Sequence, residues 1–119
     1  MIDDEPGAGR AAGASLTECQ ELTWAFRRRA KMPVTADVAL LDVCAELGEL
    51  SGAYLKNCGY APATRSVPPS NQVRAEFGDV LFALLGFAAA AGLDAGAEFA
   101  ATLQRYEERF VGGAEERHG

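Results

Sequence analysis

Apolar residues recur every three to four positions along most of the chain, and this spacing predicts amphipathic helices. Four helices are expected, over about residues 15–31, 35–57, 70–91 and 94–110. Ser15 or Thr17 is a candidate cap for the first helix, Asp94 caps the fourth, and Gly92 ends the third. No run of β-branched residues alternates with polar residues as in a strand, so the sequence predicts an all-α fold. The natural packing of four such helices is a compact antiparallel four-helix bundle.

The composition changes at both ends of the predicted helical region. Residues 1–14 are rich in Gly, Ala and Asp and are interpreted as a disordered leader, and residues 111–119 as a flexible tail. Residues 15–110 are expected to form one domain, since a chain of 119 residues has the length of a single small domain. The segment GYAPATRSVPPSN, residues 59–71, contains three prolines and predicts a loop between the second and third helices.

Charge and cysteine content narrow the classes of partner and compartment. A net charge of −6 argues against nucleic acids and anionic membranes as partners, and the longest apolar run, residues 80–91, is too short to span a bilayer. The three cysteines show no CxxC spacing, and no secretory signal is visible, which is typical of free thiols in a cytoplasmic protein. The only histidine, His118, excludes most histidine-based catalysis and metal ligation.

Two short segments repeat one acidic pattern inside the predicted helices. AELGEL, residues 45–50, and AEFGDV, residues 75–80, each place two acids three positions apart. Residues at this spacing share a helix face, so Glu46 projects with Glu49, and Glu76 with Asp79. Asp42 extends the first acidic stripe by one turn.

These acids have two interpretations, a solvated helix face or a metal site. Charged residues on amphipathic helices usually face water. However, the segment VLFALLGFAAAA, residues 80–91, is apolar around its whole circumference and is expected to be buried on all sides, so Glu76 and Asp79 open a buried helix. Two facing acidic pairs would form a cage of oxygen ligands, which suits Mg²⁺ or Mn²⁺. Gly48 and Gly78, between the acids, have two interpretations: close approach of neighbouring backbones, or glycines that an Ala- and Gly-rich sequence tolerates.

The two acidic motifs, with LKNCGY at 55–60, GLDAGAEF at 92–99 and LQRYEERF at 103–110, resemble the MazG-like nucleotide pyrophosphohydrolases over roughly residues 35–110. These belong to the all-α NTP pyrophosphatase superfamily. The resemblance implies hydrolysis of a nucleoside triphosphate to the monophosphate and pyrophosphate. It implies that four carboxylates hold Mg²⁺, namely Glu46, Glu49, Glu76 and Asp79. One of these carboxylates would also act as the base that activates the attacking water. The resemblance also implies that a second, basic group binds the phosphates: Lys56, Arg105 and Arg109.

Two other functions are also compatible with the sequence. A phosphoribosyl-ATP pyrophosphohydrolase-like enzyme and a non-catalytic helical interaction module remain open. The run Arg27–Arg29 has two interpretations, a solvated helix end or a set of phosphate contacts, of which the solvated end is the usual one. Trp24 is interpreted as a core residue, with stacking on a base as the alternative. A helix that is apolar on every side needs more cover than a single four-helix bundle supplies, so a homo-oligomer is expected, and relatives of the resembled family are dimers or tetramers.

Overall fold

The computed structural model describes residues 7–61 and 67–112, and all regular structure in these residues is helical. The helices follow one another along the chain as α1 (Ala8–Ala11), α2 (Leu16–Arg29), α3 (Ala36–Asn57), α4 (Asn71–Ala90), α5 (Ala95–Glu107) and the π-helical turn η2 (Glu108–Gly112). The all-α prediction is therefore confirmed for the part of the chain that the structure describes.

Side-chain caps set the starts of three helices. Ser15 begins α2 with a capping box, in which its hydroxyl accepts from the Glu18 amide and the Glu18 carboxylate turns back to the Ser15 amide. Ser70 accepts from the amide of Val73 at the start of α4, and Asp94 caps α5. A serine cap is worth about 1 kcal/mol of helix stability. The caps predicted at Ser15 and Asp94 are confirmed.

Left-handed residues end the long helices. Gly92 follows α4 with φ +74°, as the sequence predicts, and Gly59 follows α3 with φ +67°. At the end of α2, however, this conformation is taken by Lys31, with φ +55°. The Lys31 amide donates to Arg28 O (3.2 Å) and the Met32 amide to Arg27 O (2.8 Å), which is a Schellman arrangement. Glycine normally occupies this position because a side chain there costs about 1–2 kcal/mol.

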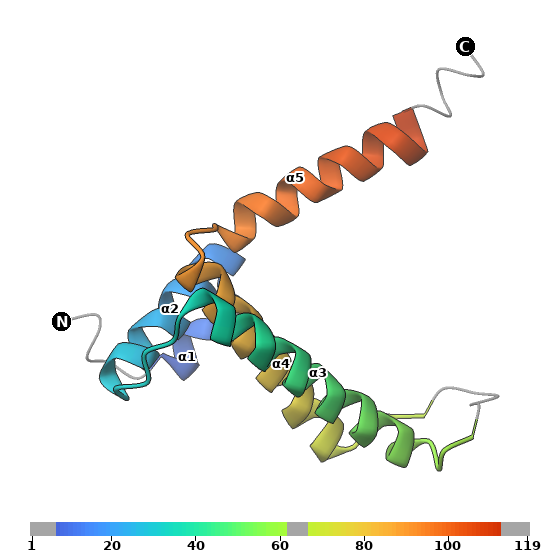
Figure 1. Ribbon diagram of the computed structural model, residues 1–119. Coiled ribbons are helices and arrows are strands. Elements are labelled where there is room, and N and C mark those ends of the chain that lie inside the picture. The colour runs from blue at the N-terminus through green and yellow to red at the C-terminus, as the bar shows by residue number, and fades with distance from the viewer. Residues whose placement is uncertain (1–6, 62–66, 113–119) are drawn as a thin grey trace.

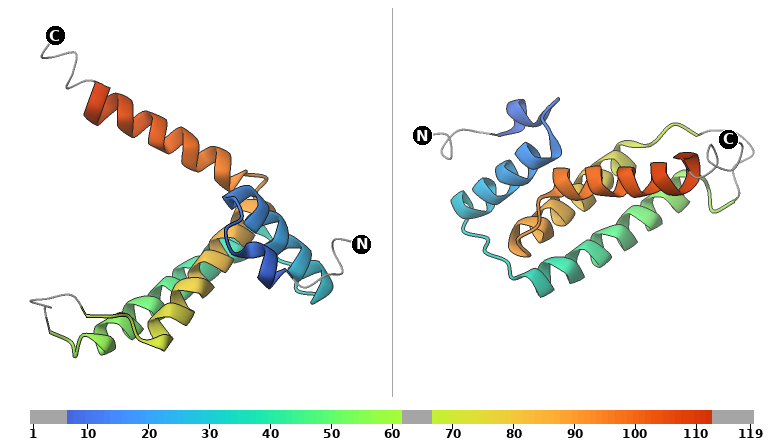
Figure 2. Two further views of the ribbon diagram at one scale, coloured as in Figure 1. Left: turned by 180° about the vertical axis from the view of Figure 1, so that it is seen from behind. Right: turned by 90° about the horizontal axis from the view of Figure 1, so that it is seen from above.

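The helices form a hairpin, a crossing helix and an arm. α3 and α4 lie side by side and antiparallel, and α2 packs against α4 (Figures 1 and 2). α5 leaves this group in another direction, with a bend of 99° between α4 and the α5–η2 segment (Figure 1). The fourth predicted helix therefore exists, but in a single chain it does not run along the α3–α4 hairpin.

Polar contacts with α2 fix the elbow between α4 and α5. The Gln20 side chain donates to Leu93 O (2.6 Å) and accepts from the Ala95 amide (2.8 Å). The hydroxyl of Thr17 donates to Asp94 Oδ1 at 2.7 Å. Because both partners on α2 bind the elbow itself, the direction of α5 follows the position of α2.

The predicted disordered leader, residues 1–14, is ordered over its second half. Residues 8–11 form α1, and the Ala11 carbonyl accepts a weak hydrogen bond from Cys19 Sγ at 3.9 Å. A side chain added at Gly7 would lie 3.3 Å from Leu22, so this segment packs on α2. Residues 1–6, and residues 113–119 of the predicted tail, lie outside the described part of the chain.

Alanines make up the buried apolar core of the described residues. They are Ala25, Ala39, Ala53, Ala83 and Ala88. Large apolar side chains remain exposed along α3, α4 and α5. Burial on all sides, expected for residues 80–91, is not reached in one chain, where Leu81 is 40% and Leu84 46% exposed. No single described helix is long and apolar enough to cross a membrane; α4 and the α5–η2 segment meet that criterion only as a bent pair.

Candidate metal centre

Three of the four predicted metal ligands lie together in the structure. Glu46 and Glu49, one turn apart on α3, meet Glu76 of α4, and one carboxylate oxygen from each lies within 4.8 Å of the others. The antiparallel packing of α3 on α4 brings the two motifs to the same level of the hairpin. We call Glu46, Glu49 and Glu76 the carboxylate cluster.

Burial leaves part of this cluster without hydrogen-bond partners. Glu46 and Glu76 are half-buried, whereas Glu49 is exposed. One oxygen of each half-buried residue, Glu46 Oε2 and Glu76 Oε2, is inaccessible and accepts no hydrogen bond. A buried acceptor without a partner is costly, and a bound cation would supply the missing interaction at both oxygens. The residues present therefore fit a hard divalent cation with oxygen ligands.

Electrostatics within the cluster are repulsive. Partial desolvation raises the pKa of Glu46, and the negative charges of Glu49 and Asp79 raise it further. Desolvation also raises the pKa of Glu76, again followed by the charges of Glu49 and Asp79. Like charges at close range disfavour ionisation, whereas a cation favours it. The cluster is thus strained electrostatically in a way that a metal ion would relieve.

The fourth predicted ligand, Asp79, lies at the margin of the cluster. It is exposed and is not one of the three residues whose oxygens converge. Its negative charge nevertheless raises the pKa of both Glu46 and Glu76. Asp42, expected at the edge of the acidic stripe, is half-buried and contributes to the raised pKa of Glu46. Negatively charged side chains therefore continue for one turn beyond the cluster on both α3 and α4.

The predicted phosphate ligands lie at different distances from the cluster. Lys56 is exposed in the last turn of α3, seven residues after Glu49, which corresponds to about 10 Å along the same helix face. Arg105 donates to Thr102 Oγ1 at 3.0 Å, and Arg109 lies over the Phe110 ring at 5.0 Å. Both arginines are on the arm that leads away from the hairpin (Figure 1), so one chain does not bring them to the carboxylates.

The expected backbone approach at the motif glycines is absent within one chain. A Cβ atom added at Gly48 or at Gly78 would meet no atom within 4 Å. Each glycine therefore faces open space, and the prediction of close packing there is wrong for a single copy.

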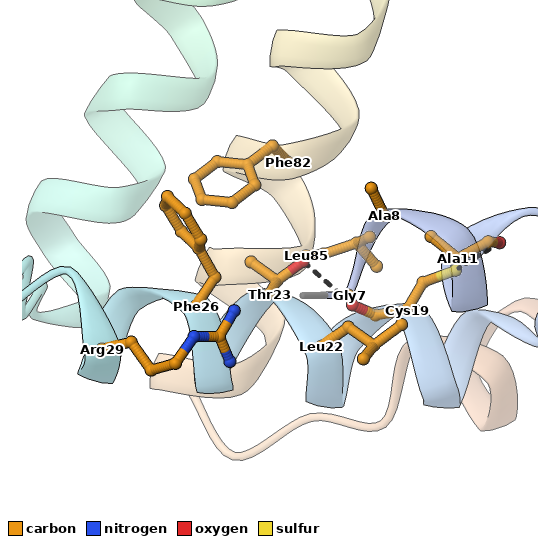
Figure 3. A pocket seen from close by; sticks show the side chains of 10 residues that line it. All are labelled: Gly7, Ala8, Ala11, Cys19, Leu22, Thr23, Phe26, Arg29, Phe82 and Leu85. Atoms are coloured by element: carbon orange, nitrogen blue, oxygen red, sulfur yellow. Dashed lines mark hydrogen bonds between the residues drawn. The ribbon is translucent and has the colours of Figure 1, made fainter. Parts of the chain in front are cut away.

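An apolar cavity lies apart from the carboxylate cluster. It has a volume of about 350 Å³ and is formed by side chains of α2 and α4 together with the segment around α1 (Figure 3). Cys19, Leu22 and Phe26 of α2 all line it. Within residues 7–61 and 67–112 no carboxylate lines this cavity, so it is separate from the carboxylate cluster.

The burial of Arg27 is not apparent from the sequence. Arg27 was interpreted with Arg28 and Arg29 as part of a solvated helix end, but its side chain is buried. The signal was its position four residues after Thr23, on the face of α2 that packs on α4.

Comparison of the chain with models of known families, with curated proteins and with solved structures finds no match. A function for this chain therefore has to agree first with the geometry of the carboxylate cluster.

Proposed function

We propose that this protein is a Mg²⁺-dependent nucleoside triphosphate pyrophosphohydrolase. The observation that carries the proposal is the meeting of Glu46, Glu49 and Glu76 across two antiparallel helices, with two buried oxygens left unpaired. These residues belong to the motifs on which the sequence resembles the MazG-like enzymes. The reaction adds water to a nucleoside triphosphate and releases the monophosphate and pyrophosphate.

Oxygen-only ligands favour Mg²⁺, with Mn²⁺ as a substitute, over zinc. Such an ion, when bound, neutralises phosphate oxygens and lowers the pKa of a coordinated water. The role of Glu46 and Glu76 is to hold that ion with their buried oxygens. Glu49 is exposed, and its negative charge helps to raise the pKa of Glu76. This position lets Glu49 both bind the ion and accept a proton from an attacking water.

Basic side chains complete the proposed substrate site. Lys56 lies in the last turn of α3, two turns after Glu49, and would contact a phosphate that extends from the cluster toward the end of the helix. Arg105 and Arg109 are carried away from the cluster of their own chain by α5. They would reach phosphates at the cluster of a second copy.

Surface area supports a homo-oligomer. The chain exposes 8718 Å², whereas a folded monomer of its mass exposes about 6,200 Å². Its radius of gyration is 17.9 Å, against about 13.5 Å for a compact domain of this length. Removing the excess from each of two copies would bury about 5,000 Å² in total, which is the scale of obligate interfaces. We therefore propose a homodimer or homotetramer as the working form.

A panel of nucleoside and deoxynucleoside triphosphates, incubated with Mg²⁺ and analysed for products, tests this function. Monophosphate plus pyrophosphate is the expected pair, and chelation should abolish their release. Diphosphate plus phosphate would indicate a different phosphohydrolase. A folded protein that is inert on every substrate would favour the non-catalytic interaction module, which the exposed apolar helix faces would also suit. Including phosphoribosyl-ATP in the panel separates the remaining alternative.

A further inference from the structure

Arg27 is a buried cation in the last turn of α2. Its side chain is only 8% exposed, and its guanidinium lies 5.0 Å from the centre of the Phe82 ring on α4. Nη1 donates a long hydrogen bond to Met32 O (3.4 Å), while Nε is buried and has no partner. A methyl group added at Gly86 would lie 3.1 Å from Nε, so α4 leaves space for this guanidinium.

No carboxylate within residues 7–61 and 67–112 pairs with Arg27. Its contacts there are an aromatic ring and one carbonyl, and neither supplies the negative charge that a buried guanidinium usually has beside it. The energetic cost of the unpaired charge would be offset by an anion bound next to it.

A cavity of about 370 Å³ adjoins Arg27. Its lining combines cations with flat apolar surfaces: Trp24, Arg27, Arg28, Lys31, Pro33 and Val34. Three of these six side chains are basic and none is acidic, although the whole chain is acidic. The volume lies within the range of about 300–1,000 Å³ typical of small-molecule sites.

Lys31 supplies an independent sign that this cavity has a role. It occupies the left-handed position that ends α2, where glycine would remove the backbone strain. Strained residues of this kind gather at ligand-binding and active sites. At Lys31, the strained position puts a cation on the wall of the cavity.

We infer that this cavity binds a small organic phosphate that carries an aromatic ring, of the nucleoside monophosphate type. The phosphate would pair with Arg27 and Lys31, since guanidinium and ammonium groups are the usual phosphate ligands in proteins. The ring would lie on the apolar wall formed by Trp24 and Pro33. None of the lining residues belongs to the carboxylate cluster, and this binding does not depend on hydrolysis there.

Trp24 is the only tryptophan in the chain, so its fluorescence reports directly on this cavity. The full-length protein is titrated with AMP in excess EDTA, which keeps divalent cations from the carboxylate cluster. The expected result is a saturable change in Trp24 fluorescence, with adenosine, which lacks the phosphate, binding at least about tenfold more weakly. A flat titration with AMP, or equal affinity for adenosine, would overturn the inference. Because no metal is present, either outcome leaves the hydrolysis proposal unaffected.

Two variants test the residues that carry the inference. Arg27→Met keeps the volume and removes the buried charge, and Lys31→Gly removes both the second cation and the backbone strain. Each should weaken AMP binding at least about tenfold without lowering the melting temperature. Arg74→Gln is the control, because Arg74 is exposed on α4 and does not line the cavity. Unchanged AMP affinity in both folded variants would overturn the assignment.

Discussion

Glu46 and Glu76 are each subject to two effects that act in the same direction. Partial desolvation raises the pKa of each carboxyl group, and so do the charges of neighbouring acids. Both effects work against the ionised form that a metal ligand needs. Binding of the proposed divalent cation would lower the cost of keeping these carboxylates charged near neutral pH, so metal binding there would stabilise the folded protein.

This linkage gives a pH dependence with a defined sign. In metal-free protein, Glu46 and Glu76 hold protons in the folded state at pH values where the unfolded chain, with glutamate pKa about 4.3, has released them. The free energy of unfolding should therefore fall as pH rises from about 4 through the raised pKa values. Adding Mg²⁺ should restore stability increasingly at higher pH. Melting temperatures in EDTA and in Mg²⁺, at fixed protein concentration, measure both trends.

The Glu46→Gln variant separates this effect from other titrating groups. Hydrogen bonds from Thr17 and from the amides of Ala97 and Gly96 lower the pKa of Asp94. Asp94 therefore stabilises the folded protein at pH values above the ordinary pKa of an aspartate, and this stabilisation is lost as the pH falls through its lowered pKa. Its contribution has the opposite sign and survives in Glu46→Gln. If the variant and the natural protein show the same decline in EDTA, Glu46 is not responsible for it.

Glu49→Gln keeps the shape of the side chain and removes one ligand charge. We expect turnover and Mg²⁺ affinity to fall by more than the roughly 100-fold typical of losing a partner of a metal ligand. The fold should persist, because Glu49 is exposed. Asp42→Asn is the matched control from one turn beyond the cluster, with an expected loss of about tenfold or less. Full activity in Glu49→Gln would remove Glu49 from the proposed site.

Helix periodicity explains why the carboxylates could be predicted from sequence. A spacing of three places two acids on one face whatever the tertiary structure, so Glu46 and Glu49 had to project together. The convergence of Glu76 with them depends on how α4 packs, which the repeated motif suggested. The burial of Arg27 was missed because a basic run at a helix end is usually solvated, and only its register with Thr23 indicated otherwise.

The elbow between α4 and α5 packs tightly against α2. Gly96 lies so close to α2 that an added Cβ would sit 2.5 Å from Thr17 Oγ1. That hydroxyl also donates to Asp94, the cap of α5. The start of the arm is therefore held by one compact contact with α2.

Gly96→Ala should destabilise the protein by about 1–3 kcal/mol, because the methyl group overpacks this contact. In a Thr17→Ala background the obstructing hydroxyl is gone, and the same substitution should cost less. Urea unfolding of the four proteins in this double-mutant cycle measures the coupling. Gly52→Ala, where a Cβ meets nothing within 4 Å, is the control and should stabilise α3 by up to about 1 kcal/mol. Strict additivity would contradict the proposed clash.

The elements themselves were largely predictable, and their arrangement was not. Caps such as Ser15 and Asp94 and the terminating Gly92 are local signals, so the helix boundaries follow closely from sequence. The direction of α5 depends on hydrogen bonds from Gln20 and Thr17, more than seventy residues earlier in the chain. No local pattern specifies such contacts, and for this reason the predicted bundle did not anticipate the arm.

At the scale of the whole molecule, α5 presents an apolar face with no cover from its own hairpin. The exposed residues recur at helical spacing along the arm: Phe99, Leu103, Tyr106 and Phe110, each between 45% and 63% exposed. Monomeric proteins rarely leave such a stripe in water. A second copy is the proposed cover, in keeping with the excess surface area of the chain.

Leu103→Glu should convert the protein from an oligomer to a species of 12.6 kDa, the mass of one chain. Leu103 is 45% exposed in the single chain, so the charge should disturb association more than the fold. Ala101→Glu adds the same charge to the opposite face of α5 and should leave the assembly intact. Light scattering at micromolar concentration compares the three proteins. A natural protein that is already a monomer would contradict the proposed assembly.

The length of the arm has a further consequence for how this chain folds. α5 contains 13 residues, and an isolated helix of that length is marginal in water. If the apolar face of α5 is covered only by another copy, the arm gains most of its helix stability at the moment of association. Folding of α5 and encounter between chains then become one concentration-dependent event, and below the concentration of that event the protein keeps its hairpin while its arm unwinds.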